Sequence, residues 1–109
     1  MLDLIIKNGH CYIEGELKDV DVAIKNGKIQ SIGKITDDSK EIIDAKNQTV
    51  LPGCIDTQTH FREPGSTDTE DLHSGSRAAV VGGITSLFEM PNTNPPTSNM
   101  KEFQRKLDL

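Results

Sequence analysis

The pattern of residues changes at Pro52-Gly53, and this change limits what the chain can fold into. Before it, short β-prone runs are separated by turn signals such as Asn-Gly. After it, runs of strand, helix, strand and helix character follow one another. A strand–helix–strand order implies parallel strands with a right-handed crossover. The chain is therefore predicted to be of α/β class, with a small β-rich domain over residues 1–51 and an incomplete α/β unit over residues 52–109.

Two Asn-Gly pairs are the strongest turn signals of the first part. Asn8-Gly9 follows the apolar run Leu4-Ile5-Ile6, and Asn26-Gly27 lies between the alternating runs 21–25 and 28–32. Both residues of a tight hairpin turn need a positive φ, which Asn and Gly tolerate best. We therefore predict a hairpin at each pair. Further strands are expected at 41–44 and 49–51, with a turn at 46–48 between them.

The second part is predicted to contain strands at 54–59 and 84–90, with helices after each of them. The first helix is expected over 69–81, because Thr67-x-x-Glu70 fits a capping box and Gly82-Gly83 follows. A second helix should be capped by Ser98 or Asn99. The face of the first helix that should pack on a sheet consists of small or aliphatic side chains: Leu72, Ser76, Ala79 and Val80.

One strand–helix–strand–helix unit has too little surface to enclose a core, and the sequence stops at Leu109 within a predicted helix. We expect the chain to be the N-terminal part of a longer protein. Expressed alone, it should be inactive and poorly soluble, because strand edges and apolar helix faces would be exposed.

Composition excludes several classes of partner. Aromatic residues make up 4%, without any Trp, and 17 acidic residues outweigh 12 basic ones. This balance argues against a nucleic-acid or an anionic-membrane partner. No apolar run approaches the ~18 residues of a membrane span, and no secretory signal begins the chain. Two cysteines without CxxC spacing fit a reducing environment, so we expect a cytoplasmic protein.

Polar side chains gather where the two strands of the second part end. Alternation along the first strand would place Asp56, Gln58 and His60 on one face, with Arg62 extending the same side. Asn92 follows the second strand. The C-terminal ends of parallel strands are where function collects. An imidazole can bind a metal and a guanidinium matches a carboxylate, so these residues indicate a small site for a metal and an anion.

The same segments resemble a known family. The run PGCIDTQTHFREPG (52–65) is similar to the first-strand motif of cyclic amidohydrolases, dihydroorotases in particular. The run from 70 to 97, which ends in EMPNTNPPT, resembles the helix and second strand that follow in that family. The pattern of residues 1–51 is similar to the small domain that precedes them. The resemblance implies the N-terminal part of a (β/α)8 TIM-type, metal-dependent hydrolase barrel preceded by a small β-sandwich domain.

The resemblance also implies roles for single residues. His60 would bind zinc, and Arg62 and Asn92 would hold the carboxylate of dihydroorotate. The reaction implied is hydrolysis of dihydroorotate to N-carbamoyl-aspartate, a step of pyrimidine synthesis. The catalytic residues and the remaining metal ligands would lie beyond residue 109.

Gln58 departs from the family pattern Asp-x-His-x-His, because it stands where the first zinc-binding histidine would be. A glutamine oxygen is a poorer zinc ligand than imidazole. Two alternatives therefore stay open. The protein would be a non-catalytic scaffold, for instance beside aspartate transcarbamoylase, or an amidohydrolase for an allantoin or hydantoin ring. A homo-oligomer is compatible with each of these hypotheses.

Overall fold

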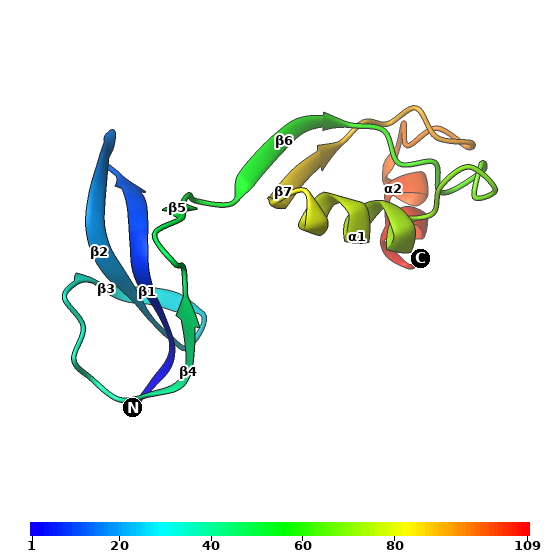
Figure 1. The fold of residues 1–109 in the computed structure, drawn as a ribbon. Helices are drawn as coiled ribbons and strands as arrows, with labels where there is room; N and C mark the ends of the chain where they lie inside the picture. Colours follow the sequence, from blue (N-terminus) through cyan, green and yellow to red (C-terminus); the bar gives the residue numbers. More distant parts are fainter. The chain divides into compact units, whose positions relative to one another are not determined.

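The computed structural model describes all 109 residues and divides them into two compact units, Met1–Pro52 and Gly53–Leu109. Strands β1 to β5 lie in the first unit, and β6, α1, β7 and α2 lie in the second (Figure 1). None of its helices has the length and apolar character that crossing a membrane requires.

The first unit is a five-stranded sheet. β2 (Glu16–Lys25) lies between β1 (Leu2–Ile13) and β3 (Lys28–Gly33), antiparallel to both. On its other side, β1 pairs in parallel with β4 (Ser39–Asp44) and then with the short β5 (Thr49–Val50). The unit is a single sheet, whereas the family resemblance implied a β-sandwich.

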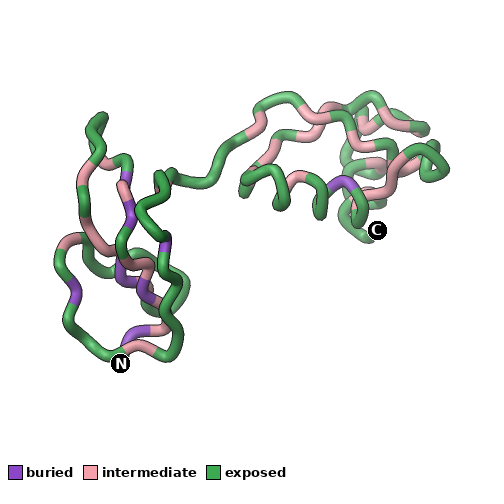
Figure 2. The backbone as a smooth tube through the Cα atoms, in the orientation of Figure 1, coloured by how far each residue is buried: buried purple, intermediate pink, exposed green.

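Small aliphatic side chains form the core of this unit. The completely buried residues Ile5 and Ala23 come from the paired strands β1 and β2, and Leu2 and Ile35 close the cluster. Burial is concentrated in this unit, as Figure 2 shows. The core is aliphatic because the chain has almost no aromatic side chains to contribute.

One predicted hairpin is confirmed and the other is wrong. Asn26 and Gly27 both have positive φ and join β2 to β3. Asn8 also has a positive φ, of 57°, but it lies within β1, where the register shifts between Ile6 and Gly9. The signal there marks a β-bulge, in which one extra residue bends the strand without reversing it. The actual turn comes later, at Glu14-Gly15.

The second unit contains the predicted strand–helix–strand order. β6 (Cys54–Thr59) and β7 (Ile84–Glu89) pair in parallel, with α1 (Leu72–Val81) between them in the chain. α2 (Met100–Leu107) follows β7 and is capped by Asn99, as predicted. The C-terminal ends of β6 and β7 are therefore neighbours, which brings together the loops that follow them.

α1 begins later than the capping box at Thr67 predicted. Its N-cap is Asp71, whose carboxylate accepts from the backbone N–H of Ser74 at 2.6 Å. The hydroxyl of Ser74 accepts in return from the N–H of Asp71 at 3.1 Å, so this pair is the actual capping box. Thr67 belongs to the loop before the helix, in which the backbone N–H groups of Thr69 and Glu70 donate to the carbonyl of Ser66.

The packed face of α1 matches the predicted one only in part: Leu72 and Ala79 are half-buried, whereas Ser76 and Val80 are exposed. Gly75 is its only buried residue, whereas Val80 is 69% exposed. A Cβ on Gly75 would lie 2.6 Å from the ring of Phe61, so the missing side chain leaves room for that ring. A glycine has no apolar side chain, so the pattern of apolar residues did not mark Gly75 as part of the packed face.

Candidate active site at the ends of β6 and β7

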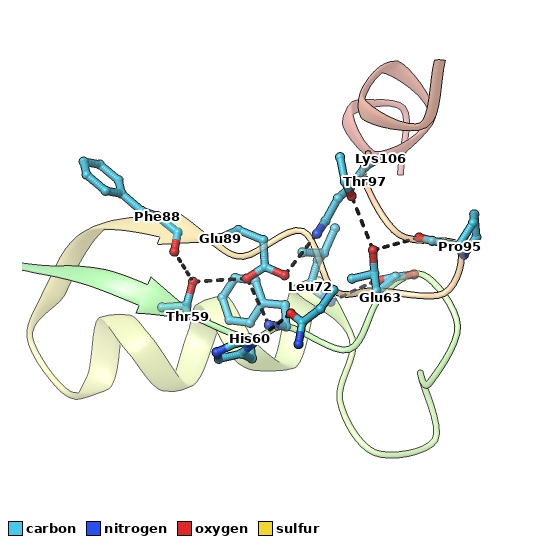
Figure 3. A network of polar contacts seen from close by, with 12 residues as sticks. Thr59, His60, Glu63, Leu72, Phe88, Glu89, Pro95, Thr97 and Lys106 are labelled. Carbon is cyan, nitrogen blue, oxygen red and sulfur yellow. Dashed lines mark hydrogen bonds and ion pairs between the residues drawn. The ribbon is translucent and has the colours of Figure 1, made fainter. Parts of the chain in front are cut away.

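His60 and Asn92 meet where the two parallel strands end. His60 directly follows β6, and Asn92 lies three residues after the end of β7. Nδ1 of the imidazole lies 2.9 Å from Oδ1 of the Asn92 amide (Figure 3). Both residues are exposed, so the imidazole faces solvent.

This hydrogen bond determines which nitrogen of His60 is free. An amide oxygen can only accept, so Nδ1 carries the proton and donates it to Oδ1 of Asn92. In the neutral imidazole the lone pair then lies on Nε2, the other ring nitrogen. A metal-binding histidine typically donates its second N–H to an oxygen in this way, which fixes its tautomer and ring orientation.

Arg62 keeps its guanidinium free of ion pairs. No carboxylate lies within salt-bridge distance of it, although Glu63 and Asp68 are close in sequence. Glu63 is used differently, because its Oε2 accepts from the backbone N–H of Leu72 at 2.8 Å in the first turn of α1. The Arg62 side chain is exposed and so remains available to an anion.

The loops that carry Arg62 and Asn92 are bound to each other. The carbonyl of Pro64 accepts from the N–H of Asn94 at 3.0 Å. Gly65 has a φ of +109°, and a Cβ there would lie 2.6 Å from Cβ of Asn94 and closer still to its carbonyl oxygen. The Glu-Pro-Gly sequence after Arg62 therefore has a structural role: it caps α1 and allows the two loops to approach.

Neither Gln58 nor Asp56 forms a hydrogen bond with His60. The register between β6 and β7 shifts from Asp56 opposite Leu87 to Thr59 opposite Glu89, so β6 accommodates one extra residue. A bulge of this kind interrupts the alternation between Asp56 and His60, which would otherwise share one face. Asp56 instead accepts from the backbone N–H of Gln58 at 3.0 Å, and the exposed Gln58 side chain makes no hydrogen bond.

One imidazole in this region could contribute to binding a metal. His60 offers the free Nε2 that zinc requires, so it fits the role of a ligand. No three His, Cys, Asp or Glu side chains come together to enclose an ion. His60 alone would therefore not enclose an ion, and the neutral amide of Gln58 would add only a weak oxygen donor.

Glu89 is a residue of this site that the sequence reasoning missed. It is the last residue of β7, and its carboxylate binds the residues on either side of His60. The available signal was a carboxylate at the end of an apolar strand, ITSLFE. Such a residue is rarely buried without a partner.

Comparison with known proteins shows which family this chain is similar to. Residues 49–108 match the model of the Amidohydrolase family. A curated allantoinase of Escherichia coli (strain SMS-3-5 / SECEC) is 47% identical over 107 residues, which is 97% of this chain and 24% of that protein. The chain thus spans about a quarter of the length of the curated relatives it matches.

Solved structures agree with this placement. An L-hydantoinase (dihydropyrimidinase) from Arthrobacter aurescens superposes with a TM-score of 0.88 and 32% identity, over 97% of this chain and 24% of that one. A D-hydantoinase from Bacillus sp. AR9 gives a TM-score of 0.78 at 28% identity, over 95% of this chain and 24% of that one.

Proposed function

Because the chain belongs to the amidohydrolase family, we propose that the full-length protein is a metal-dependent hydrolase of a cyclic amide, with an allantoin- or hydantoin-type ring as its substrate. The similarity to an allantoinase over 97% of the chain supports this ring class over dihydroorotate, which the sequence motifs favoured. The fold shared with an L-hydantoinase supports it as well.

The hydrogen bond between His60 and Asn92 is the observation that carries the proposal. It joins the ends of two parallel strands and leaves Nε2 of the imidazole free. Zinc bound at such a site would polarise the ring carbonyl and activate water. His60 would hold the metal through Nε2, while Asn92 keeps the proton on Nδ1 and the ring in one orientation.

Dihydroorotate remains a second candidate substrate because of Arg62. Its guanidinium is exposed, unpaired and two residues from the imidazole. A planar guanidinium binds a carboxylate through two parallel hydrogen bonds. Dihydroorotate carries a carboxylate on its ring, whereas allantoin and unsubstituted hydantoin do not. Arg62 is therefore the residue that separates the two hypotheses.

The test is hydrolysis of allantoin, hydantoin and dihydroorotate by the full-length protein, with and without Arg62→Ala. If the ring lacks a carboxylate, the substitution should leave KM for allantoin or hydantoin nearly unchanged. If dihydroorotate is the substrate, Arg62→Ala should raise its KM about 10- to 100-fold, since a hydrogen bond to a charged group contributes about 1.5–3 kcal/mol. Arg77→Ala, an exposed arginine on α1, is the matched control.

Metal analysis of the purified protein completes the test. About one or two zinc ions per chain, together with hydrolysis of any of the three rings, would support the proposed class. A folded full-length protein that binds no zinc and hydrolyses none of the rings would overturn it and favour the non-catalytic scaffold.

A further inference from the structure

The carboxylate of Glu89 is shared by three donors and is largely withdrawn from solvent. Its Oε2 accepts from the backbone N–H of Phe61 at 3.0 Å and lies 3.1 Å from the Thr59 hydroxyl, which shares its single proton between Glu89 and the Phe88 carbonyl, also at 3.1 Å. Its Oε1 accepts from Nζ of Lys106 at 3.0 Å. The Glu89 and Lys106 side chains are only 17% and 11% exposed. Figure 3 shows the carboxylate between the end of β6 and the α2 lysine.

The two β6-side donors flank His60 in the chain. Thr59 precedes the imidazole and Phe61 follows it, so one oxygen atom contacts the Thr59 side chain and the Phe61 backbone on either side of His60. A backbone hydrogen bond of 2.9 Å from Met90 to the Thr59 carbonyl adds a second connection between the same strand ends. The Phe61 ring then fills the space over Gly75 of α1. His60 is thus exposed, but the backbone that carries it is held from three directions.

Glu89 also lies three residues before Asn92 in the chain. It ends β7, so the same residue anchors the strand that delivers the partner of Nδ1. Lys106 supplies the positive charge that a withdrawn carboxylate requires. Charge-assisted hydrogen bonds of this kind are about twice as strong as neutral ones, which suits a residue that must hold a fixed geometry.

We propose that Glu89 is a positioning residue for His60: with Lys106 as its counter-ion, it fixes the strand ends that bring the imidazole against Asn92, which would keep Nε2 free to bind a metal. The consequence for metal binding rests on the proposed function. The His60–Asn92 hydrogen bond that Glu89 is proposed to support does not depend on that function. Glu89 touches neither ring nor metal and acts only through the two strand ends.

Two readouts on the full-length protein test this role, with Glu89→Ala, Glu89→Gln and the control Glu102→Gln. Glu102 is a comparably shielded carboxylate, 18% exposed, but it pairs with Arg105 on α2. The first readout is the zinc affinity, measured by competition with a chelator. Glu89→Ala should weaken it about 10- to 100-fold, the range typical of residues that orient a metal ligand. Glu89→Gln should recover part of the loss because its amide oxygen can still accept from Phe61, and Glu102→Gln should change nothing.

The second readout is the tautomer of His60, measured by ¹⁵N NMR of protein labelled at histidine and assigned with His60→Asn. In the wild type, Nδ1 should carry the proton; in Glu89→Ala, the two ring nitrogens should move towards averaged shifts. An unchanged tautomer and zinc affinity in a folded Glu89→Ala protein would overturn the proposal. If Glu89→Ala does not fold, Glu89→Gln is judged by the same criteria. A wild type that binds no zinc would refute the proposed function alone, because the tautomer still reports on Glu89.

Discussion

At the scale of single residues, Gln58 is the position at which this chain differs most from the family pattern. The amide makes no hydrogen bond, and the bulge in β6 lies between Asp56 and Thr59. Nothing in the structure therefore gives Gln58 a packing role that would explain its presence. An exposed side chain near His60 can be exchanged without disturbing a core.

Replacing Gln58 by His should strengthen the proposed metal site. An imidazole is a better zinc ligand than an amide oxygen, so Gln58→His in the full-length protein should raise zinc affinity at least about tenfold. Elemental analysis after dialysis against a chelator measures the effect. Lys101→His, at an exposed position of α2, should have no such effect. Equal gains from both substitutions would show that Gln58 does not face the metal.

Substitutions at two glycines distinguish the cost of backbone strain from the cost of steric overlap. Gly65 and Gly83 both have a positive φ, of +109° and +83°, but only Gly65 lies against another segment, at Asn94. Gly83→Ala should cost about 1–2 kcal/mol for the left-handed conformation alone. Gly65→Ala should cost about 1–3 kcal/mol more, because its Cβ overlaps Asn94. Urea midpoints of the full-length variants measure the difference, and equal midpoints would contradict the close approach of the two loops.

At the scale of elements, local sequence signals predicted which segments form strands and helices better than where they end. Asn26-Gly27 and Asn8-Gly9 are the same dipeptide, yet only the first makes a turn. The difference comes from tertiary contacts: Gly9 is buried and a Cβ there would lie 2.6 Å from Val50, so β1 must continue past it to pair with β5. That contact joins residues 41 positions apart, beyond the reach of any local pattern.

The site could be predicted from sequence only in part, for a related reason. The sequence pattern predicts that β6 and β7 are parallel and that the residues after them are neighbours. The contact of His60 with Asn92 agrees with that expectation. The extra residue in β6 could not be predicted from the sequence, because a bulge does not change the pattern of apolar and polar residues in a recognisable way. The function of Glu89 was also hidden, since its donors come from β6 and α2 and meet only in the fold.

The capping box of α1 gives this element a pH dependence. The backbone N–H of Ser74, and then its hydroxyl, hold the pKa of Asp71 below its usual value of 3.8. A carboxylate whose pKa is lowered by folding contributes stability. This contribution is fully present at pH values above the pKa of the group in the unfolded chain, and it is lost as the pH falls through its pKa in the folded protein. The first turn of α1 should therefore loosen only at pH values below about 4.

Hydrogen exchange of the first turn of α1 tests this dependence in wild type and Asp71→Asn. Asparagine still caps the helix but does not titrate. Relative to Asp71→Asn, the wild type should be better protected at about pH 6 and should lose that advantage at about pH 3. The same protection difference at both pH values would show that the charge of Asp71 does not contribute.

At the scale of the whole molecule, the two units differ in how much they bury. The first has a continuous aliphatic cluster, whereas Gly75 is the only buried residue in the second (Figure 2). β6 and β7 pair only with each other, so each has an unpaired edge. Large apolar side chains are exposed on these elements: Ile55 61%, Val80 69%, Val81 90% and Phe88 60%. A two-stranded parallel sheet of this kind needs further elements against it.

Residues 1–109 expressed alone should therefore self-associate and lack ring-hydrolysing activity. Unpaired strand edges and exposed apolar side chains drive association between copies. Size-exclusion chromatography and binding of an apolar fluorescent dye measure the effect. The double substitution Val81→Lys and Phe88→Lys should increase the monomeric fraction because it removes two of the exposed apolar groups, whereas Lys101→Gln on the exposed surface of α2 should not. A dye-negative monomer that melts cooperatively would show that the second unit is stable with only the contacts present in this chain.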